Sequence, residues 1–180
     1  MSATSSGTSG EAKPAIVVAT ITASDTRTTA DDEGGRLLRE LLATAGFRTL
    51  DHTIVREDLE TLRAAVVAAS DRDDVDAVIV TGGTGLGPRD VTIEAIAPIL
   101  DKVMDGFGEA FRRLSWDEVG ARSMLSRAIA GTRGKRIVVA LPGSPNGVRL
   151  GVTALVAPVL AHAVAVARGE AKHHHKKPKE

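Results

Sequence analysis

Short apolar runs alternate along the chain with longer amphipathic stretches. Three of the runs are rich in valine and isoleucine, which is typical of strands whose two faces are both covered. The segment RTLDHTIV fits a further strand between two helical patterns. The predicted strands are residues 15–22, 48–55, 75–81 and 135–143.

Two helices are predicted between the first strand and the strand at 75–81. Residues 33–47 repeat leucine at helical spacing and reach their end at Gly46, and residues 59–70 have a similar pattern. Strands that alternate with helices of this length indicate β–α–β units around a mainly parallel sheet. The right-handed crossover rule places helices on both faces of that sheet. The sequence therefore predicts an α/β fold.

The composition adds limits on domain number and on partners. A chain of 180 residues with 43% hydrophobic content is long enough for one domain with a large core. We expect that domain at residues 15–167, after a disordered N-terminus at 1–14 and before a charged flexible tail at 168–180, whose adjacent histidines are a minor candidate for metal binding. Lys plus Arg and Asp plus Glu number 23 each, so net charge gives no reason to expect a nucleic-acid partner.

Cysteine is absent, which excludes disulfides, thiolate metal sites and cysteine nucleophiles. The N-terminus has no apolar segment of the kind a secretory signal needs, so a cytoplasmic protein is expected. The longest apolar stretch, residues 150–167, approaches the length of a membrane span but carries Gly151, Pro158 and His162. We expect a helix buried in protein, not in a membrane, with one face covered by another subunit.

The segment TGGTGLGPRD, residues 81–90, follows a predicted strand and contains four glycines. Glycine permits positive φ and close backbone approach, so that successive N–H groups can bind an anion. The alternative is a tight connection between a strand and a helix. The spacing matches neither a dinucleotide-binding G-x-G-x-x-G motif nor a P-loop. Phosphate binding by the loop backbone, in neither of these two motifs, is the favoured interpretation over a tight connection.

Polar side chains follow several of the predicted strands. Asp90 is either a helix N-cap or an oxygen ligand for Mg²⁺ near bound phosphates. Asp58 also follows a strand, and a helix cap is the simpler reading of it. Ser24 and Asp25 supply a hydroxyl and a carboxylate after the first strand. These groups should meet, because the carboxyl ends of parallel strands share one sheet edge.

Three further segments leave alternatives open. Residues 142–147, PGSPNG, offer Ser144 and Asn146 in what is either a binding turn or a plain connection. Arg127 is either an anion contact or a surface charge. Residues 106–108 are expected to precede a short helix, and the aromatic residues are expected to be packing anchors: Phe107, Phe111 and Trp116.

Five motifs occur together in a fixed order and are far more specific than any one of them. They are SDTR, TGGTG followed by RDVTIEAI, GFGEAFRRLS, MLSRAIAG and LPGSPN, from about Ile16 to about His162. In this combination the chain resembles the MoaB/Mog family of molybdenum-cofactor biosynthesis, and GFGEAFRRLS and GTRGKR most resemble its MoaB branch. Gly34 and Gly147 depart from the family pattern, which often has serine and alanine there.

The resemblance implies a three-layer α/β/α molybdopterin-binding fold, assembled as a homo-oligomer, either a trimer or a hexamer. It implies an enzyme that uses Mg²⁺ and ATP to adenylylate the terminal phosphate of molybdopterin, with release of pyrophosphate. Asp58 and Asp90 match the two critical aspartates, expected to be catalytic and to hold the metal. The positions that match the pterin and nucleotide pocket are Ser24, Asp25, Gly82, Gly83, Thr84, Gly85, Ser144, Pro145 and Asn146.

The MoaB branch also includes members whose catalytic contribution is not clear. The alternative is therefore a non-catalytic oligomer that binds molybdopterin or a protein partner and retains the fold.

Overall fold

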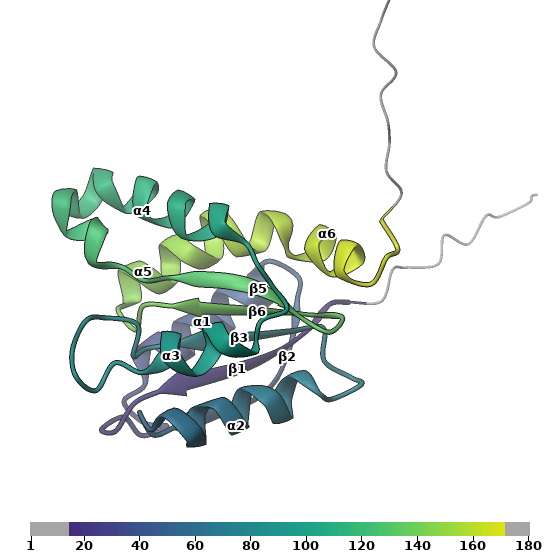
Figure 1. Cartoon of the computed structure of the whole chain (residues 1–180), viewed down its shortest axis with the longest axis horizontal. Coiled ribbons are helices and arrows are strands. Elements are labelled where there is room, and N and C mark those ends of the chain that lie inside the picture. The colour runs from purple at the N-terminus through teal and green to yellow at the C-terminus, as the bar shows by residue number, and fades with distance from the viewer. Residues whose placement is uncertain (1–14, 172–180) are drawn as a thin grey trace, which may run out of the picture.

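The computed structural model describes residues 15–171, which form a sheet with helices on both faces (Figure 1). The helices are α1 (Glu33–Thr44), α2 (Leu59–Ser70), α3 (Thr92–Ile96), α4 (Asp105–Val119), α5 (Pro145–Leu150) and α6 (Ala157–Ala167). The strands are β1 (Val17–Ala23), β2 (Arg48–Val55), β3 (Ala77–Thr81), β4 (Lys102–Val103), β5 (Ile129–Arg133) and β6 (Arg136–Leu141). The predicted N-terminal segment 1–14 and residues 172–180 of the predicted tail 168–180 lie outside the described residues.

The sheet has six strands in the order β2-β1-β3-β6-β5-β4. Strands β2, β1, β3 and β6 run parallel to one another, whereas β5 pairs antiparallel with both β6 and β4. The mainly parallel sheet predicted from the sequence is confirmed. One strand, β5, runs against the others in the described sheet, and its reversal matters for the site below.

Two apolar cores cover the two faces of the sheet, because alternate residues of each central strand point to opposite faces. On one face Val18, Ile79 and Val139 pack with residues of α1, α4 and the helices from α5 to α6. On the other face Val78 and Val80 pack with residues of α2 and α3. Figure 1 shows α4, α5 and α6 on one side of the sheet and α2 on the other. These are the three layers of the predicted α/β/α fold.

The C-terminal helical segment runs from Pro145 to Ala167, with a π-helical stretch at Gly151–Val156 between α5 and α6. It is long and apolar enough to cross a membrane by length and composition, with a mean hydropathy of 2.1 over its most apolar window, of which 28% is buried. Its buried residues recur every fourth position and pack on the sheet: Val148, Val152, Val156, Leu160 and Val164. One face of this helix therefore belongs to the core of the domain.

Two expectations about local structure are wrong, those for residues 106–108 and for Trp116. Residues 106–108 lie inside the first turns of α4, which begins at Asp105, and do not precede the helix. Ser144 caps α5 with its hydroxyl, which leaves both alternatives open for the segment after Pro142, a binding turn or a plain connection. Trp116 is 51% exposed, although Phe111 is buried and Phe107 packs against the core as expected.

Candidate functional site

A cavity of about 460 Å³ opens where β1, β3 and β6 end. Its walls come from the three loops that follow these strands, together with the start of α1 and Glu57 after β2. Five of the nine residues expected in the pocket line it: Ser24, Gly82, Gly83, Ser144 and Pro145. The segments are separated by up to about 120 residues in sequence and meet because their strands are parallel neighbours.

The glycine loop begins with two residues in the left-handed region. Gly82 has a φ of 95° and Gly83 a φ of 61°. A Cβ atom at Gly82 would lie 2.4 Å from the carbonyl oxygen of Ala23 at the end of β1, closer than real Cβ contacts come. The Oγ1 atom of Thr92 donates to the Gly82 carbonyl at 2.7 Å, and its amide donates to the Gly83 carbonyl at 2.9 Å. Glycine is therefore required here to bring the loop backbone against β1.

Glu57 lines the cavity, and the carboxylates of Asp25 and Asp90 lie near enough to act on its charge. Asp25 Oδ1 accepts from the Glu57 amide at 3.2 Å, and Asp25 Oδ2 lies 3.5 Å from the guanidinium of Arg89 in the glycine loop. Burial raises the pKa of Glu57, and the negative charges of Asp90 and Asp25 raise it further, while Arg89 opposes them. Arg56 Nε also lies 3.8 Å from Asp25 Oδ1, and a bound cation or a proton would reduce the repulsion that acts on Glu57.

Asp58 and Asp90 lie in different settings. Asp58 is the N-cap of α2, with Oδ1 accepting from the amide of Thr61 at 2.9 Å and from its hydroxyl at 2.6 Å. These bonds hold the pKa of Asp58 below its ordinary value. Glu57, rather than Asp58, lines the cavity. Glu57 is not among the residues predicted from the sequence, although Glu57 belongs to the same segment after β2 as Asp58.

Asp90 does not cap a helix. Helix α3 begins at Thr92 with Val91 at its N-cap position and no side-chain capping bond. Asp90 Oδ2 accepts instead from the amide of Gly87 at 2.8 Å, so the carboxylate points back into the glycine loop. Next to burial, the negative charge of Asp90 contributes to the raised pKa of Glu57. Of the two alternatives for Asp90, the helix cap is wrong, and a role as a metal ligand stays a prediction.

A buried polar network supports the floor of the cavity. Asp32 caps α1 by accepting from the Gly35 amide at 2.9 Å, and its other carboxylate oxygen lies 2.8 Å from Thr22 Oγ1 and 2.8 Å from His52 Nε2. Burial opposes ionisation of Asp32, but these hydrogen bonds outweigh it and hold the pKa of Asp32 below its ordinary value. Thr22 and Asp32 both line the cavity, so the network fixes its wall.

The remaining predicted residues flank the cavity. Thr84 is buried within the loop, and Gly85 lies beside the Asp90 carboxylate. Asn146 lines a separate cavity of about 150 Å³ that shares Ser144 with the first. Within residues 15–171 no group of three or more His, Cys, Asp or Glu side chains is arranged to hold a metal ion. A cation here would therefore take part of its coordination from a ligand or from water.

The matched family model defines the class of protein. A model described as a probable molybdopterin binding domain matches residues 19–162, which include all of the loops that form the cavity. The fold and this match identify the chain as a molybdopterin-binding domain of the α/β/α type.

Relatives and solved structures identify the family more closely. Molybdenum cofactor biosynthesis protein B of Bacillus cereus is 48% identical over 143 residues, 79% of this chain and 85% of the relative. A crystal structure of a molybdenum cofactor biosynthesis protein B has a TM-score of 0.85 at 44% identity, covering 88% of this chain and 99% of the other. The tungsten cofactor synthesizing protein MoaB from Pyrococcus furiosus has a TM-score of 0.77 at 35% identity, covering 87% and 99%. The chain belongs to the MoaB/Mog family of molybdenum-cofactor biosynthesis proteins.

Proposed function

We propose that this protein is a molybdopterin adenylyltransferase. An oxygen of the molybdopterin phosphate attacks the α-phosphorus of ATP, the bond from that phosphorus to the β-phosphate bridging oxygen breaks, and pyrophosphate leaves. The observation that carries the proposal is the cavity itself, where a positive-φ glycine backbone faces clustered carboxylates. Such a transfer depends on positioning and charge neutralisation and needs no protein nucleophile.

Backbone and side-chain donors suit the phosphates. Gly82, Gly83 and Gly143 put bare backbone on the cavity wall, so a phosphate can approach it closely. The Gly82 amide already donates to the Leu141 carbonyl at 3.1 Å, so the amides of Gly83 and Gly143 are the candidate phosphate donors. Arg27 adds a cation on the same wall, where its Nη1 donates to the Asp31 carbonyl at 2.8 Å. Ser24 and Ser144 add hydroxyl groups to the same wall.

The carboxylates support the proposed use of Mg²⁺. Asp25, Glu57 and Asp90 would repel the phosphates of ATP; burial raises the pKa of Glu57, and the charges of Asp90 and Asp25 raise it further. Carboxylate oxygens are the ligands Mg²⁺ prefers, and it keeps positions for substrate phosphates and water. When bound, Mg²⁺ would neutralise charge on the transferring phosphate. Asp90 with the segment Glu57–Asp58 is the proposed metal-binding and catalytic set.

The first experiment is incubation of the purified protein with molybdopterin and Mg·ATP, following adenylylated molybdopterin and pyrophosphate. Asp90→Asn should lower turnover by at least about 100-fold with the fold intact. Glu57→Gln and Asp58→Asn form a matched pair, because Glu57 lines the cavity and Asp58 caps α2. If both aspartates act as the family resemblance implies, Asp58→Asn reduces turnover more than Glu57→Gln does; the reverse order transfers the second role to Glu57.

A wild-type protein that binds molybdopterin but forms no product would contradict the enzymatic proposal. It would leave the alternative, a non-catalytic oligomer that binds molybdopterin or a protein partner. Self-association is part of both proposals and is supported by exposed apolar residues on α6, where Val159 and Val166 are 51% and 49% exposed. A cavity of about 580 Å³ between β4 and α6 adjoins this surface. We propose that the protein forms a trimer, or a hexamer built from trimers.

A further inference from the structure

Arg127 joins two distant parts of the glycine loop. Its Nε atom donates to the carbonyl of Thr84 at 3.2 Å, and one of its Nη atoms donates to the carbonyl of Asp90 at 3.2 Å. The side chain is only 27% exposed. From the sequence, Arg127 is either an anion contact or a surface charge. In the structure its guanidinium donates hydrogen bonds to two backbone carbonyls of the protein itself.

The two carbonyls bound by Arg127 lie at the two ends of the segment 84–90. Inside this segment, the Asp90 amide donates to the Gly87 carbonyl at 3.0 Å, and the Gly87 amide donates to the Asp90 carboxylate at 2.8 Å. These bonds close a turn at the second half of the segment only. Arg127 closes the whole segment, so it removes conformational freedom that Gly85 and Gly87 would otherwise give the backbone.

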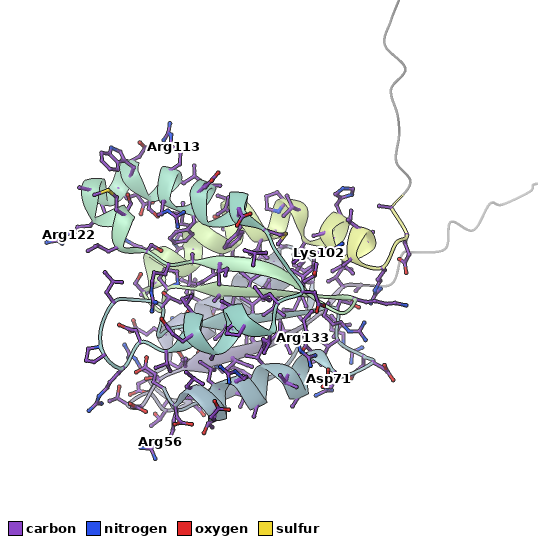
Figure 2. All side chains as sticks on the ribbon, viewed as in Figure 1. Arg56, Asp71, Lys102, Arg113, Arg122 and Arg133 are labelled. Carbon is purple, nitrogen blue, oxygen red and sulfur yellow. The ribbon has the colours of Figure 1, made fainter. Side chains whose placement is uncertain are left out.

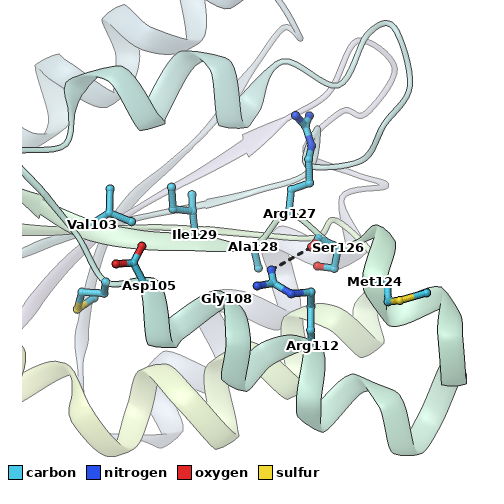
Figure 3. A pocket seen from close by; sticks show the side chains of 10 residues that line it. Val103, Asp105, Gly108, Arg112, Met124, Ser126, Arg127, Ala128 and Ile129 are labelled. Atoms are coloured by element: carbon cyan, nitrogen blue, oxygen red, sulfur yellow. Dashed lines mark hydrogen bonds between the residues drawn. The ribbon is translucent and has the colours of Figure 1, made fainter.

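Glu94 in α3 holds the guanidinium in this position. Its two carboxylate oxygens accept from the Nη atoms of Arg127 at 2.5 and 3.3 Å, a two-point contact that fixes the plane of the guanidinium. The hydrogen bond from Arg127 lowers the pKa of Glu94. Figure 3 shows Arg127 pointing away from Arg112, which instead lies beside Ser126. The neighbouring arginine therefore does not share this contact.

The reversed strand explains why Arg127 is within reach. Ile129 pairs with Ala140 near the end of β6, whereas Arg133 pairs with Arg136 at the start of β6. Because β5 is antiparallel, its beginning lies at the edge where β3 ends and the glycine loop begins. A parallel strand would have put its first residues at the opposite edge.

We propose that Arg127 is a positioning residue that holds the glycine loop and Asp90 in the shape required for adenylyl transfer. This inference rests on the proposed function for its catalytic consequence. Its structural part, that Arg127 determines the order of the loop, is independent of whether the protein turns over.

Arg133, the last residue of β5, provides a matched control for Arg127, which lies two residues before the start of the same strand. It is 24% exposed, close to the value for Arg127, and it pairs with the carboxylate of Asp71 and with Ser70 Oγ, 3.0 Å away. Figure 2 shows Arg133 beside Asp71 at one end of the sheet, away from Arg56, which follows β2 at the end with the site. Arg127→Gln and Arg133→Gln thus each remove a bridging arginine from one end of β5.

The first measurement is hydrogen–deuterium exchange of the unliganded protein. Arg127→Gln should speed exchange at the hydrogen-bonded amides of Gly87, Asp90 and Thr92 by at least about tenfold, because several charge-assisted bonds are lost. Arg133→Gln should leave these amides unchanged. Glu94→Gln keeps Arg127 but weakens its anchor, so it should give an intermediate rate and serves if Arg127→Gln fails to fold. Unchanged loop exchange in both Arg127→Gln and Glu94→Gln would overturn the proposal.

Turnover then tests the catalytic part. Arg127→Gln should lower kcat by about 10- to 100-fold, since misplacement of a site by about 1 Å has effects of this size, with a smaller change in KM for ATP. Arg127→Lys retains the charge but cannot make the same two-point contact, so it should recover only part of kcat. A kcat equal to that of Arg133→Gln, despite faster loop exchange, would refute the catalytic role. An inactive wild type would count against the proposed function and leave the exchange result to decide the structural role.

Discussion

Replacement of Gly82 by alanine tests whether the close contact between the glycine loop and β1 is needed for the fold. Gly82 has a φ of 95°, and an added Cβ atom would lie 2.4 Å from the Ala23 carbonyl oxygen. Gly46 is the matched control, because its φ is 85° and an added Cβ would meet nothing within 4 Å. Both variants place alanine in the left-handed region, but only Gly82→Ala also forces two backbones apart.

The expected losses of stability differ accordingly. The left-handed backbone alone costs about 1–2 kcal/mol for a residue with a Cβ atom, which is the expected effect of Gly46→Ala. Overpacking adds about 1–3 kcal/mol, so Gly82→Ala should lose about 2–5 kcal/mol. The overpacking cost arises because the added Cβ meets a backbone atom of β1, which cannot move aside as a flexible side chain does.

Urea unfolding of the wild type and both variants measures these free energies, provided that the slopes agree. Gly82→Ala should also weaken ATP binding, since the loop amides and the end of β1 both line the cavity. Equal losses for the two variants would show that the contact with Ala23 relaxes freely. The assignment of Gly82 as a residue required by packing would then be refuted.

Three further results are expected. Asp32→Asn should lower the free energy of unfolding by about 1.5–3 kcal/mol at neutral pH. Because the folded-state pKa of Asp32 is depressed, this stabilisation is complete above the unfolded value near 3.9 and is lost as pH falls through the folded-state pKa. In urea titrations the difference in stability between wild type and variant should therefore shrink in acid, and a growing difference would contradict the argument. Phe111→Ala should cost about 3–5 kcal/mol by urea unfolding, because Phe111 is 2% exposed, and a loss below 1 kcal/mol would contradict its place in the core. Val166→Asp should lower the mass measured by light scattering, and a wild-type monomer would contradict the predicted oligomer.

The sequence predicted the central strands well for a physical reason. β1, β3 and β6 are covered on both faces, so they consist of continuous apolar runs that are visible without a structure. β5 contains Gly131 and ends at Arg133, and it has no such run. Its strand conformation comes from pairing with β6, which sequence periodicity does not record.

The site was predictable in proportion to how local its signals are. The glycine loop, Ser24 and Ser144 stand beside strand ends and could be placed at one sheet edge from topology alone. The contact of Asp32 with His52 depends on the register of β2 against β1 and on the start of α1, so no sequence spacing reveals it. Glu57 and Asp58 are neighbours, and only the backbone geometry decides which caps the helix and which faces the cavity.

The reversal of β5 shows how one topological feature changes the meaning of a motif. In an all-parallel sheet, the segment SRA before β5, residues 126–128, would lie at the edge away from the site, and Arg127 would be a surface charge. In the antiparallel arrangement the same arginine reaches Thr84 and Asp90, while Arg133 at the other end of the strand reaches Asp71. The strand direction therefore assigns one arginine to the candidate site and the other to the scaffold. This is why the comparison of these two arginines separates an effect on the loop from a general loss of stability.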